Sequence, residues 1–367
     1  MKNFIAMCIG LVCTLLAINA WAGTFAPPIP PSKRLIMDDT FYDQNTQLDH
    51  VLASIRRDKG IRIVGIGDST MYGAIVHANQ TIPYYLQQTL QAKDKNQTIH
   101  VYNLAFPGAR PADLYAMLKR VKAAKPDLIF IDVNIVFFSD KVLHEAALAN
   151  KMFKREFLFA HDVPNGIFTE NRLEEIVTTL VKDTNIGQYK KEINEKLFGK
   201  APRLYVQDWA HAVQTGEPVK TANPQTTASA QQNPLIGKSW RQRVWDAKEQ
   251  QVMARIYAQG PIPGANDSVM MLRDMIRYAR ANHLNTVFYL TPQNETLIGK
   301  FFSLPQLHQN EDYLIHIMQQ EGAWMVDLRH AVPADDFGDY DHMLSAGNRL
   351  IAQHLADVIS RKGGISR

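Results

Sequence analysis

Short apolar runs alternate along this chain with longer amphipathic stretches. Five of the runs have the length and the β-branched content of buried strands. They cover Ile61–Ile66, Thr98–Leu104, Asp127–Asn134, Thr286–Leu290 and Ala323–Leu328. The stretches around them carry apolar residues at helical spacing, at Thr81–Ala92, Pro111–Lys122, Ser268–Asn282, Pro305–Gln320 and Ala346–Ser360. Strands that alternate with helices predict an α/β fold, a doubly wound five-stranded parallel sheet.

Two regions do not follow this alternation. Residues 23–59 begin with a proline-rich run and are expected to form an extended, wrapping segment ahead of a domain over residues 60–367. Between the third and fourth strands, residues 140–263 form an expected insertion with helices near Arg172–Lys182 and Trp240–Ala258. Within it, Gln214–Asn233 is rich in Thr, Ala, Gln and Pro, which predicts a mobile loop.

The first 22 residues have the pattern of a secretory signal peptide. Lys2 precedes an apolar stretch from Phe4 to Ile18, and Ala20-Trp21-Ala22 is a small-x-small cleavage pattern. We therefore expect an exported, periplasmic protein, with an uncleaved membrane anchor as the alternative.

Both cysteines of the chain lie in this leader, and neither follows the small residue that a lipoprotein signal requires. The mature chain is thus expected to contain no disulfide, no thiolate nucleophile and no cysteine metal site. The net charge of +4 is small for 367 residues, and no basic stripe with interleaved aromatic residues is present, which argues against nucleic acid as a partner. The twelve histidines show no HExxH-type spacing, and we expect neither a metal nor a cofactor.

Polar residues and glycines follow the expected strands at the edge where parallel sheets bind ligands. In chain order they are Ser69, Gly108, Asn134, the pair Gln293 and Asn294, and finally Asp339 and His342. A serine hydroxyl becomes a nucleophile when a base lies within hydrogen-bond reach, and an acid that accepts from the other ring nitrogen orients that base. Ser69, His342 and Asp339 supply this set. The alternative acid, Asp341, is adjacent to His342 and would have to fold back on it.

Ser69 has two alternative roles besides that of a nucleophile. A serine at this place is often a helix N-cap. A dinucleotide-binding turn is excluded by spacing, because Gly65-x-Gly67 lacks the third glycine of that motif. For a nucleophile, the backbone amides of Ser69 and Gly108 and the side-chain amide of Asn134 are candidate oxyanion donors. Arg110, Gln293 and Asn294 are candidates for a polar substrate pocket.

These motifs resemble the SGNH/GDSL hydrolase superfamily. The resemblance rests on Gly67-Asp68-Ser69 followed by Gly73, on Asn103 through Gly108, and on Asp339-x-x-His342 before a helix. It covers Ile61 to Ile359 apart from the insertion and implies a flavodoxin-like sheet with a Ser-Asp-His triad. The third block departs, because Asp132-Val133-Asn134-Ile135 stands where the family usually has Gly-x-Asn-Asp.

The leader and the insertion are similar to those of exported cell-envelope members, namely the D-alanyl transfer protein of teichoic acid modification and the alginate O-acetylation proteins. The resemblance implies an exported serine esterase or O-acyltransferase that acts on acyl esters of an envelope glycan or lipid, with a membrane-bound acyltransferase as a partner. The alternative is a catalytically impaired module that binds envelope polysaccharide or a partner membrane protein. A flavodoxin-like cofactor binder is a third, less favoured interpretation.

Overall fold

The computed structural model divides the chain into two compact units, with Met1–Pro31, Asp38–Asp49 and Glu170–Gln232 in the first and the rest in the second. The residues described here are 2–23, 41–138, 148–149, 151–158, 160, 163–164, 167–168, 174, 177, 181, 184–188, 193, 235–247, 249–251, 260–264 and 266–361. In the first unit they form helices α1 (Lys2–Ala22) and α8 (Asn185–Gln188) and the first half of α2 (Phe41–Arg57). The predicted mobile loop at 214–233 lies outside the described residues, as do most residues of the helix predicted at 172–182.

The second unit is built on a five-stranded sheet. Its strands are β1 (Ile61–Ile66), β2 (Ile99–Asn103), β3 (Leu128–Val133), β4 (Thr286–Leu290) and β5 (Trp324–Asp327). The strand order is β2-β1-β3-β4-β5, and every neighbouring pair is parallel. The predicted fold class is therefore confirmed, and the predicted strands agree with the observed ones to within one residue at either end.

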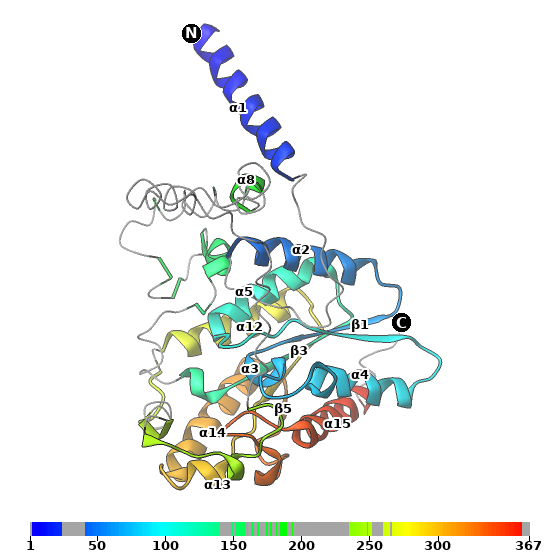
Figure 1. Ribbon diagram of the computed structural model, residues 1–367, viewed down its shortest axis with the longest axis vertical. Helices are drawn as coiled ribbons and strands as arrows, with labels where there is room; N and C mark the ends of the chain where they lie inside the picture. Colours follow the sequence, from blue (N-terminus) through cyan, green and yellow to red (C-terminus); the bar gives the residue numbers. More distant parts are fainter. Residues whose placement is uncertain are drawn as a thin grey trace, which may run out of the picture. The chain divides into compact units, whose positions relative to one another are not determined.

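Helices cover both faces of this sheet. They are α4 (Ile82–Lys93), α5 (Pro111–Val121), α12 (Asp267–Ala281), α14 (Leu304–Gln320) and α15 (Ser345–Arg361). Helix α4 packs against α15, and α5 packs against α12. Figure 1 shows these two pairs on opposite sides of the strands. The central strands β3 and β4 are buried at every position, as expected for a sheet covered on both sides.

Two of these helices, α4 and α12, begin at side-chain caps. The Thr81 hydroxyl accepts a hydrogen bond from the Tyr84 amide at the start of α4. The Asn266 side chain accepts from two amides at the start of α12, which sets that helix one residue earlier than predicted. Short elements fill the connections: α3 (Ser69–Tyr72), η2 (Ala78–Gln80), η3 (Lys122–Ala124), η4 (Ile135–Phe138), η5 (Lys151–Phe157), η6 (Trp240–Gln242), α13 (Glu295–Ile298) and η7 (Ala334–Asp336).

Two of the expected segments differ from the structure. Residues 23–59 are not extended throughout, because helix α2 occupies Phe41–Arg57; Leu48, Leu52 and Ile55 are spaced as on one helical face. The helix predicted from Trp240 to Ala258 does not begin at Trp240. A single 3₁₀ turn ends at Gln242, and Arg243 is extended with φ −90° and ψ 144°. The guanidinium of Arg243 pairs with Asp339, a contact that local helical pattern cannot reveal.

Candidate active site

Ser69 is the first residue of α3, and only Gly67 and Asp68 separate it from the end of β1. The N-cap of this short helix is Asp68, whose Oδ1 accepts from the Thr70 amide at 2.7 Å. The capping role that a serine could have played is thus filled by its neighbour. Ser69 remains partly exposed, with its hydroxyl available for other contacts.

A continuous hydrogen-bonded chain joins Ser69 to His342 and Asp339. His342 Nε2 lies 2.8 Å from Ser69 Oγ. On the other side of the ring, Nδ1 lies 2.9 Å from Asp339 Oδ1 and 3.0 Å from Oδ2. Asp339 also accepts from the backbone amide of His342 at 2.8 Å, which fixes the ring against the carboxylate. This is the geometry that a base needs to deprotonate a serine.

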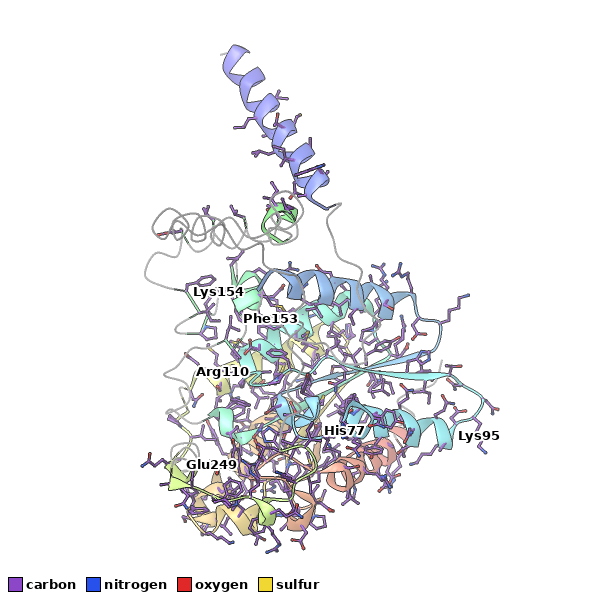
Figure 2. All side chains as sticks on the ribbon, in the orientation of Figure 1. His77, Lys95, Arg110, Phe153, Lys154 and Glu249 are labelled. Atoms are coloured by element: carbon purple, nitrogen blue, oxygen red, sulfur yellow. The ribbon has the colours of Figure 1, made fainter. Side chains whose placement is uncertain are left out.

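Asp339 is buried but well compensated. Arg243 Nη1 donates to its Oδ2 at 3.1 Å, while Arg243 Nη2 donates to Glu249 Oε1 at 3.2 Å. Glu249 is labelled in Figure 2. Burial alone would raise the pKa of Asp339, but the charge and hydrogen bonds of His342, with help from Arg243, lower it below the ordinary value. Asp339 is therefore held ionised.

A second carboxylate stands at the same ring nitrogen. Asp341 Oδ1 lies 3.0 Å from His342 Nδ1, although it is not aligned for a hydrogen bond. Burial would lower the pKa of His342, but Asp339 and Asp341 together outweigh it and raise that pKa well above the ordinary value. The ring of Tyr340 lies beside that of His342, with the two ring centroids 6.2 Å apart.

These charges predict how activity depends on pH. A protonated His342 cannot take the serine proton, so kcat/KM should fall as pH drops through the raised pKa. Asp341→Asn removes one of the two negative charges at Nδ1, and we expect the acid limb of the kcat/KM profile to move to lower pH with the pH-independent maximum nearly kept. A profile of kcat/KM against pH for both proteins measures this, and an unmoved limb would show that Asp341 does not act on His342.

The backbone amides of Ser69 and Gly108 are the two backbone donors that the sequence predicts for an oxyanion. Within the described part of the chain, no protein acceptor takes the amides of Ser69 or Gly108. Gly108 has φ +75°, a left-handed conformation that residues with a side chain rarely adopt. The turn after β2 therefore requires glycine at this position.

Asn134 sits at the end of β3, but its amide is already engaged. Its Nδ2 donates to Asp68 Oδ2 at 2.7 Å and to Asp341 Oδ2 at 2.9 Å. An amide NH2 has two hydrogens, so both are donated to carboxylates in this arrangement. To serve as a third oxyanion donor, as the sequence predicts, Asn134 would have to release one of these bonds.

The three predicted pocket residues are distributed differently. Gln293 is buried and donates to Asn134 Oδ1 at 3.3 Å, so it belongs to the polar network of the site. Asn294 is fully buried and caps α13, with its Nδ2 on the carbonyl of Asp339 at 3.0 Å; it supports the loop that carries the acid. Arg110, labelled in Figure 2, is the N-cap of α5, and its backbone amide donates to Asp113 Oδ2.

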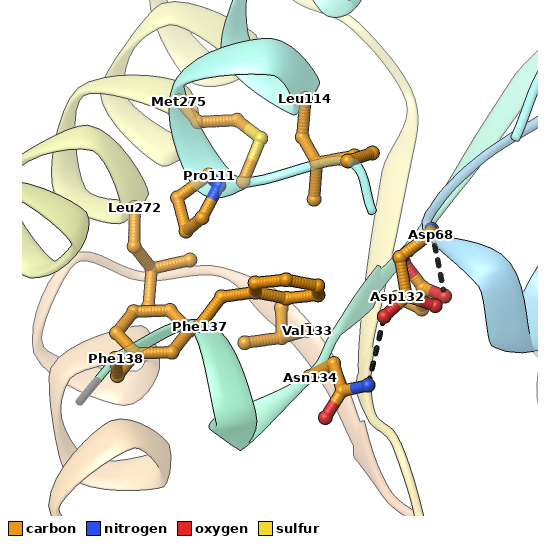
Figure 3. Close-up of a pocket in the computed structure, with 11 residues that line it drawn as sticks. Asp68, Pro111, Leu114, Asp132, Val133, Asn134, Phe137, Phe138, Leu272 and Met275 are labelled. Carbon is orange, nitrogen blue, oxygen red and sulfur yellow. Dashed lines mark hydrogen bonds between the residues drawn. The ribbon is translucent and has the colours of Figure 1, made fainter. Parts of the chain in front are cut away.

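An apolar cavity borders these residues (Figure 3). Its polar end is formed by Asp68, Asp132 and Asn134. The remaining walls are apolar and come from the loop before α5, from α5, α12 and η4, and from the end of β3: Ala109, Pro111, Leu114, Val133, Phe137, Phe138, Leu272 and Met275. The cavity volume is about 10 Å³, which is room for about one water molecule.

Among the described residues, one group has the composition and spacing of a metal site. Ligand atoms of Asp339, Asp341 and His342 lie within 4.8 Å of one another. In the structure, however, His342 Nδ1 and the Arg243 guanidinium already satisfy Asp339. The arrangement therefore matches a carboxylate that orients a histidine better than an open metal site.

Sequence reasoning did not find three residues of this network. Arg243 lies in the insertion, 96 positions from its partner Asp339, and carries no local signal. Thr70 bridges two carboxylates, Asp68 and Asp132, and the only sequence signal for it is its position next to Ser69. Asp132 was noted only as a departure from the family pattern.

Comparisons with known proteins found solved structures of similar fold, but no match at the level of sequence. No family model and no curated protein matches the sequence. The chain is similar to LAE5, an alpha/beta hydrolase from the metagenome of Lake Arreo, at 13% identity and a TM-score of 0.39, over 85% of this chain and 100% of that one. It is also similar to a catalytic mutant of Axe2, an acetylxylan esterase from Geobacillus stearothermophilus (13%, TM-score 0.37, 85% and 97%). A member of the lipolytic G-D-S-L family from Veillonella parvula matches at 10% identity and a TM-score of 0.37, over 82% and 98%. Since the identities are this low, the activity of the chain has to be argued from its own residues.

Proposed function

We propose that this protein is a serine esterase or O-acyltransferase that acts through a covalent acyl-serine. One observation carries the proposal: Ser69 Oγ, both nitrogens of His342 and the carboxylate of Asp339 form one hydrogen-bonded chain. Ser69 and His342 are partly exposed at the carboxyl edge of the sheet, while Asp339 is buried behind them. This arrangement supports the proposal that Ser69 is the nucleophile, His342 the base and Asp339 the orienting acid.

The reaction follows from this placement. Ser69 Oγ attacks the ester carbonyl, and His342 Nε2 takes the hydroxyl proton. The amides of Ser69 and Gly108 stabilise the oxyanion of the tetrahedral intermediate. When the intermediate collapses, the ester C–O bond breaks and His342 returns the proton to the leaving alcohol. Water or an acceptor hydroxyl then attacks the acyl-serine, with His342 as the base, and frees Ser69.

The acyl group in this proposal is short. The apolar cavity is bordered by Asp68 and Ala109, the neighbours of the two oxyanion amides, and it has room for about one water molecule. A methyl group matches that space, whereas a longer chain would have to displace packed side chains. Acetyl is therefore the preferred acyl group, and fatty acyl chains are poor substrates.

Chain-length preference tests this assignment. With p-nitrophenyl esters, we expect kcat/KM to fall from acetyl to butyryl by about tenfold per added methylene. Leu114→Ala enlarges the cavity and should raise butyryl turnover relative to acetyl. Leu118→Ala, one turn further along α5 and equally buried but outside the cavity, is the matched control and should leave the ratio unchanged. Faster octanoyl than acetyl turnover by the wild type would exclude the short-chain assignment while leaving the serine mechanism intact.

The physiological ester in this proposal belongs to a cell-envelope glycan or lipid, and a membrane-bound acyltransferase is the proposed partner. The leader-like N-terminus motivates this placement. Incubation of the protein with an O-acetylated polysaccharide distinguishes the outcomes: free acetate indicates hydrolysis, and acetyl groups on an added glycan indicate transfer. If neither appears while small esters are cleaved, the envelope substrate is wrong.

Export is proposed on the same N-terminal pattern, which lies in α1 (Lys2–Ala22). No helix among the described residues combines the length and the apolar character needed to cross a membrane. The intact mass of the protein recovered from the exported fraction tests cleavage after Ala22. A mass that retains the first 22 residues would favour the anchor alternative.

The second candidate is a catalytically impaired module that binds envelope polysaccharide or a partner membrane protein. It is favoured by Asn134, whose two amide hydrogens are committed to Asp68 and Asp341. Measurable polysaccharide binding without any acyl-serine would support this candidate. Acylation of Ser69 at a catalytic rate would exclude it.

A further inference from the structure

The hydroxyl of Thr70, next to Ser69, contacts two carboxylates but carries a single hydrogen. Its Oγ1 lies 2.7 Å from Asp68 Oδ1 and 3.0 Å from Asp132 Oδ2. A threonine hydroxyl carries one hydrogen and can donate to only one of these oxygens, and an ionised carboxylate has none to offer. If both acids were ionised, one of the two contacts would place lone pairs against each other. The geometry therefore requires one additional proton.

The contacts indicate which acid carries that proton. Asp68 accepts three hydrogen bonds of 2.7 Å, from the Thr70 amide, the Thr70 hydroxyl and Asn134 Nδ2. Such bonds stabilise an ionised carboxylate. Among the described residues, Asp132 accepts from one backbone amide, that of Asp68, at 3.2 Å and 3.3 Å from its two oxygens, and otherwise contacts only the shared Thr70 hydroxyl. Asp132 is therefore the acid that can carry the proton and donate a hydrogen bond to the Thr70 hydroxyl.

The surroundings of Asp132 also disfavour a charge. Its side chain is 1% exposed and lies against Gly67, where an added Cβ would come within 2.6 Å of Oδ1. The titratable groups that face it are Asp68 and, in register on β4, the buried Tyr289. Neither Asp68 nor Asp132 has a cationic partner in the described part of the chain. Burial, and then the charge of Asp68, raise the pKa of Asp132 well above its ordinary value.

We propose that Asp132 is a positioning residue held as a neutral carboxylic acid: its hydroxyl donates to Thr70, Thr70 donates to Asp68, and Asp68 holds the turn that carries Ser69. The same oxygen pair accepts the Asp68 amide and so fixes the backbone just before the nucleophile. Neutrality has a further consequence, because a second negative charge beside this turn would oppose an oxyanion formed at the Ser69 amide.

Stability against pH tests the proton without any substrate. In the unfolded chain Asp132 ionises near pH 3.9, whereas the folded protein keeps the proton to higher pH. Above about pH 4, therefore, each pH unit should raise the unfolding constant of the wild type tenfold relative to Asp132→Asn, until Asp132 ionises in the fold. Denaturant unfolding of the full chain between pH 5 and 9 measures the ratio. A ratio that does not change with pH would overturn the proposal.

Infrared spectroscopy gives a second readout that is independent of reversible unfolding. At pH 7 the wild type should show the carbonyl band of a neutral carboxylic acid that is missing in Asp132→Asn, and absence of the band would equally overturn the proposal. For activity, Asp132→Asn keeps a donor and an acceptor and should retain more of the wild-type kcat/KM than Asp132→Leu. Asp132→Leu, similar in size but without hydrogen bonds, should lower kcat at unchanged KM. The stability and infrared measurements hold whether or not the proposed esterase function does.

Discussion

Replacing Ser69 with alanine is expected to lower kcat for a short acyl ester by about a million-fold, the loss typical of a serine nucleophile. The hydroxyl is the only group on α3 that contacts His342 Nε2, at 2.8 Å. Without it no acyl-enzyme forms, and the base has nothing to deprotonate but water. Initial rates with p-nitrophenyl acetate, measured at a pH above the acid limb, give the effect directly.

The matched control for this variant is Ser303→Ala. Ser303 is exposed at the start of α14 and makes no side-chain capping bond, so its removal should leave kcat unchanged. Both variants should unfold at nearly the wild-type denaturant midpoint, since the Ser69 hydroxyl contributes one partly exposed hydrogen bond. If Ser69→Ala turned over acetyl esters as fast as the wild type, the acyl-serine mechanism would be wrong.

The second large effect is expected at Asp339. Asp339→Asn should lower kcat by about 10⁴-fold, because an amide beside Nδ1 favours the wrong tautomer of His342. Two further losses follow from the contacts: Arg243 loses one of its two ionised partners and keeps Glu249, and the His342 amide loses a charged acceptor. Single-turnover rates with an acetyl ester would isolate the acylation step that this tautomer controls.

Asp341→Asn is the matched comparison, because it changes the other carboxylate at the same nitrogen. Asp341 makes no aligned hydrogen bond to His342, so its loss should shift the pH profile and reduce kcat by less than about tenfold. A larger loss for Asp341→Asn than for Asp339→Asn would reassign the acid of the triad to Asp341.

The fold was accessible from sequence because its signals are local. Each strand is a short apolar run between turn residues, and capping residues such as Thr81 mark where helices begin. The pattern does not predict helix α2, because its sequence is mostly polar and follows a proline-rich stretch. The helix predicted from Trp240 is too long, because the backbone is extended at Arg243 and its guanidinium pairs with Asp339, which is distant in sequence.

The candidate site was accessible in part for the same reason. Ser69, Asp339 and His342 stand at strand ends, and the topology of a parallel sheet brings those ends to one edge. The acceptor to which each side-chain hydrogen is donated could not be predicted from the sequence. Asn134 was assigned to the oxyanion from its position, yet its amide bridges two acids, and the proton shortage at Thr70 follows only from distances across 62 residues of sequence.

The central claim is that Ser69 is an activated nucleophile, and covalent labelling tests it most directly. The full chain is treated with a fluorophosphonate and digested, and the modified peptide is identified by mass spectrometry, with Ser69→Ala and His342→Ala alongside. The account predicts a single adduct on Ser69, absent in Ser69→Ala and formed far more slowly in His342→Ala. Labelling elsewhere, or an unlabelled Ser69 in folded wild-type protein, would contradict it.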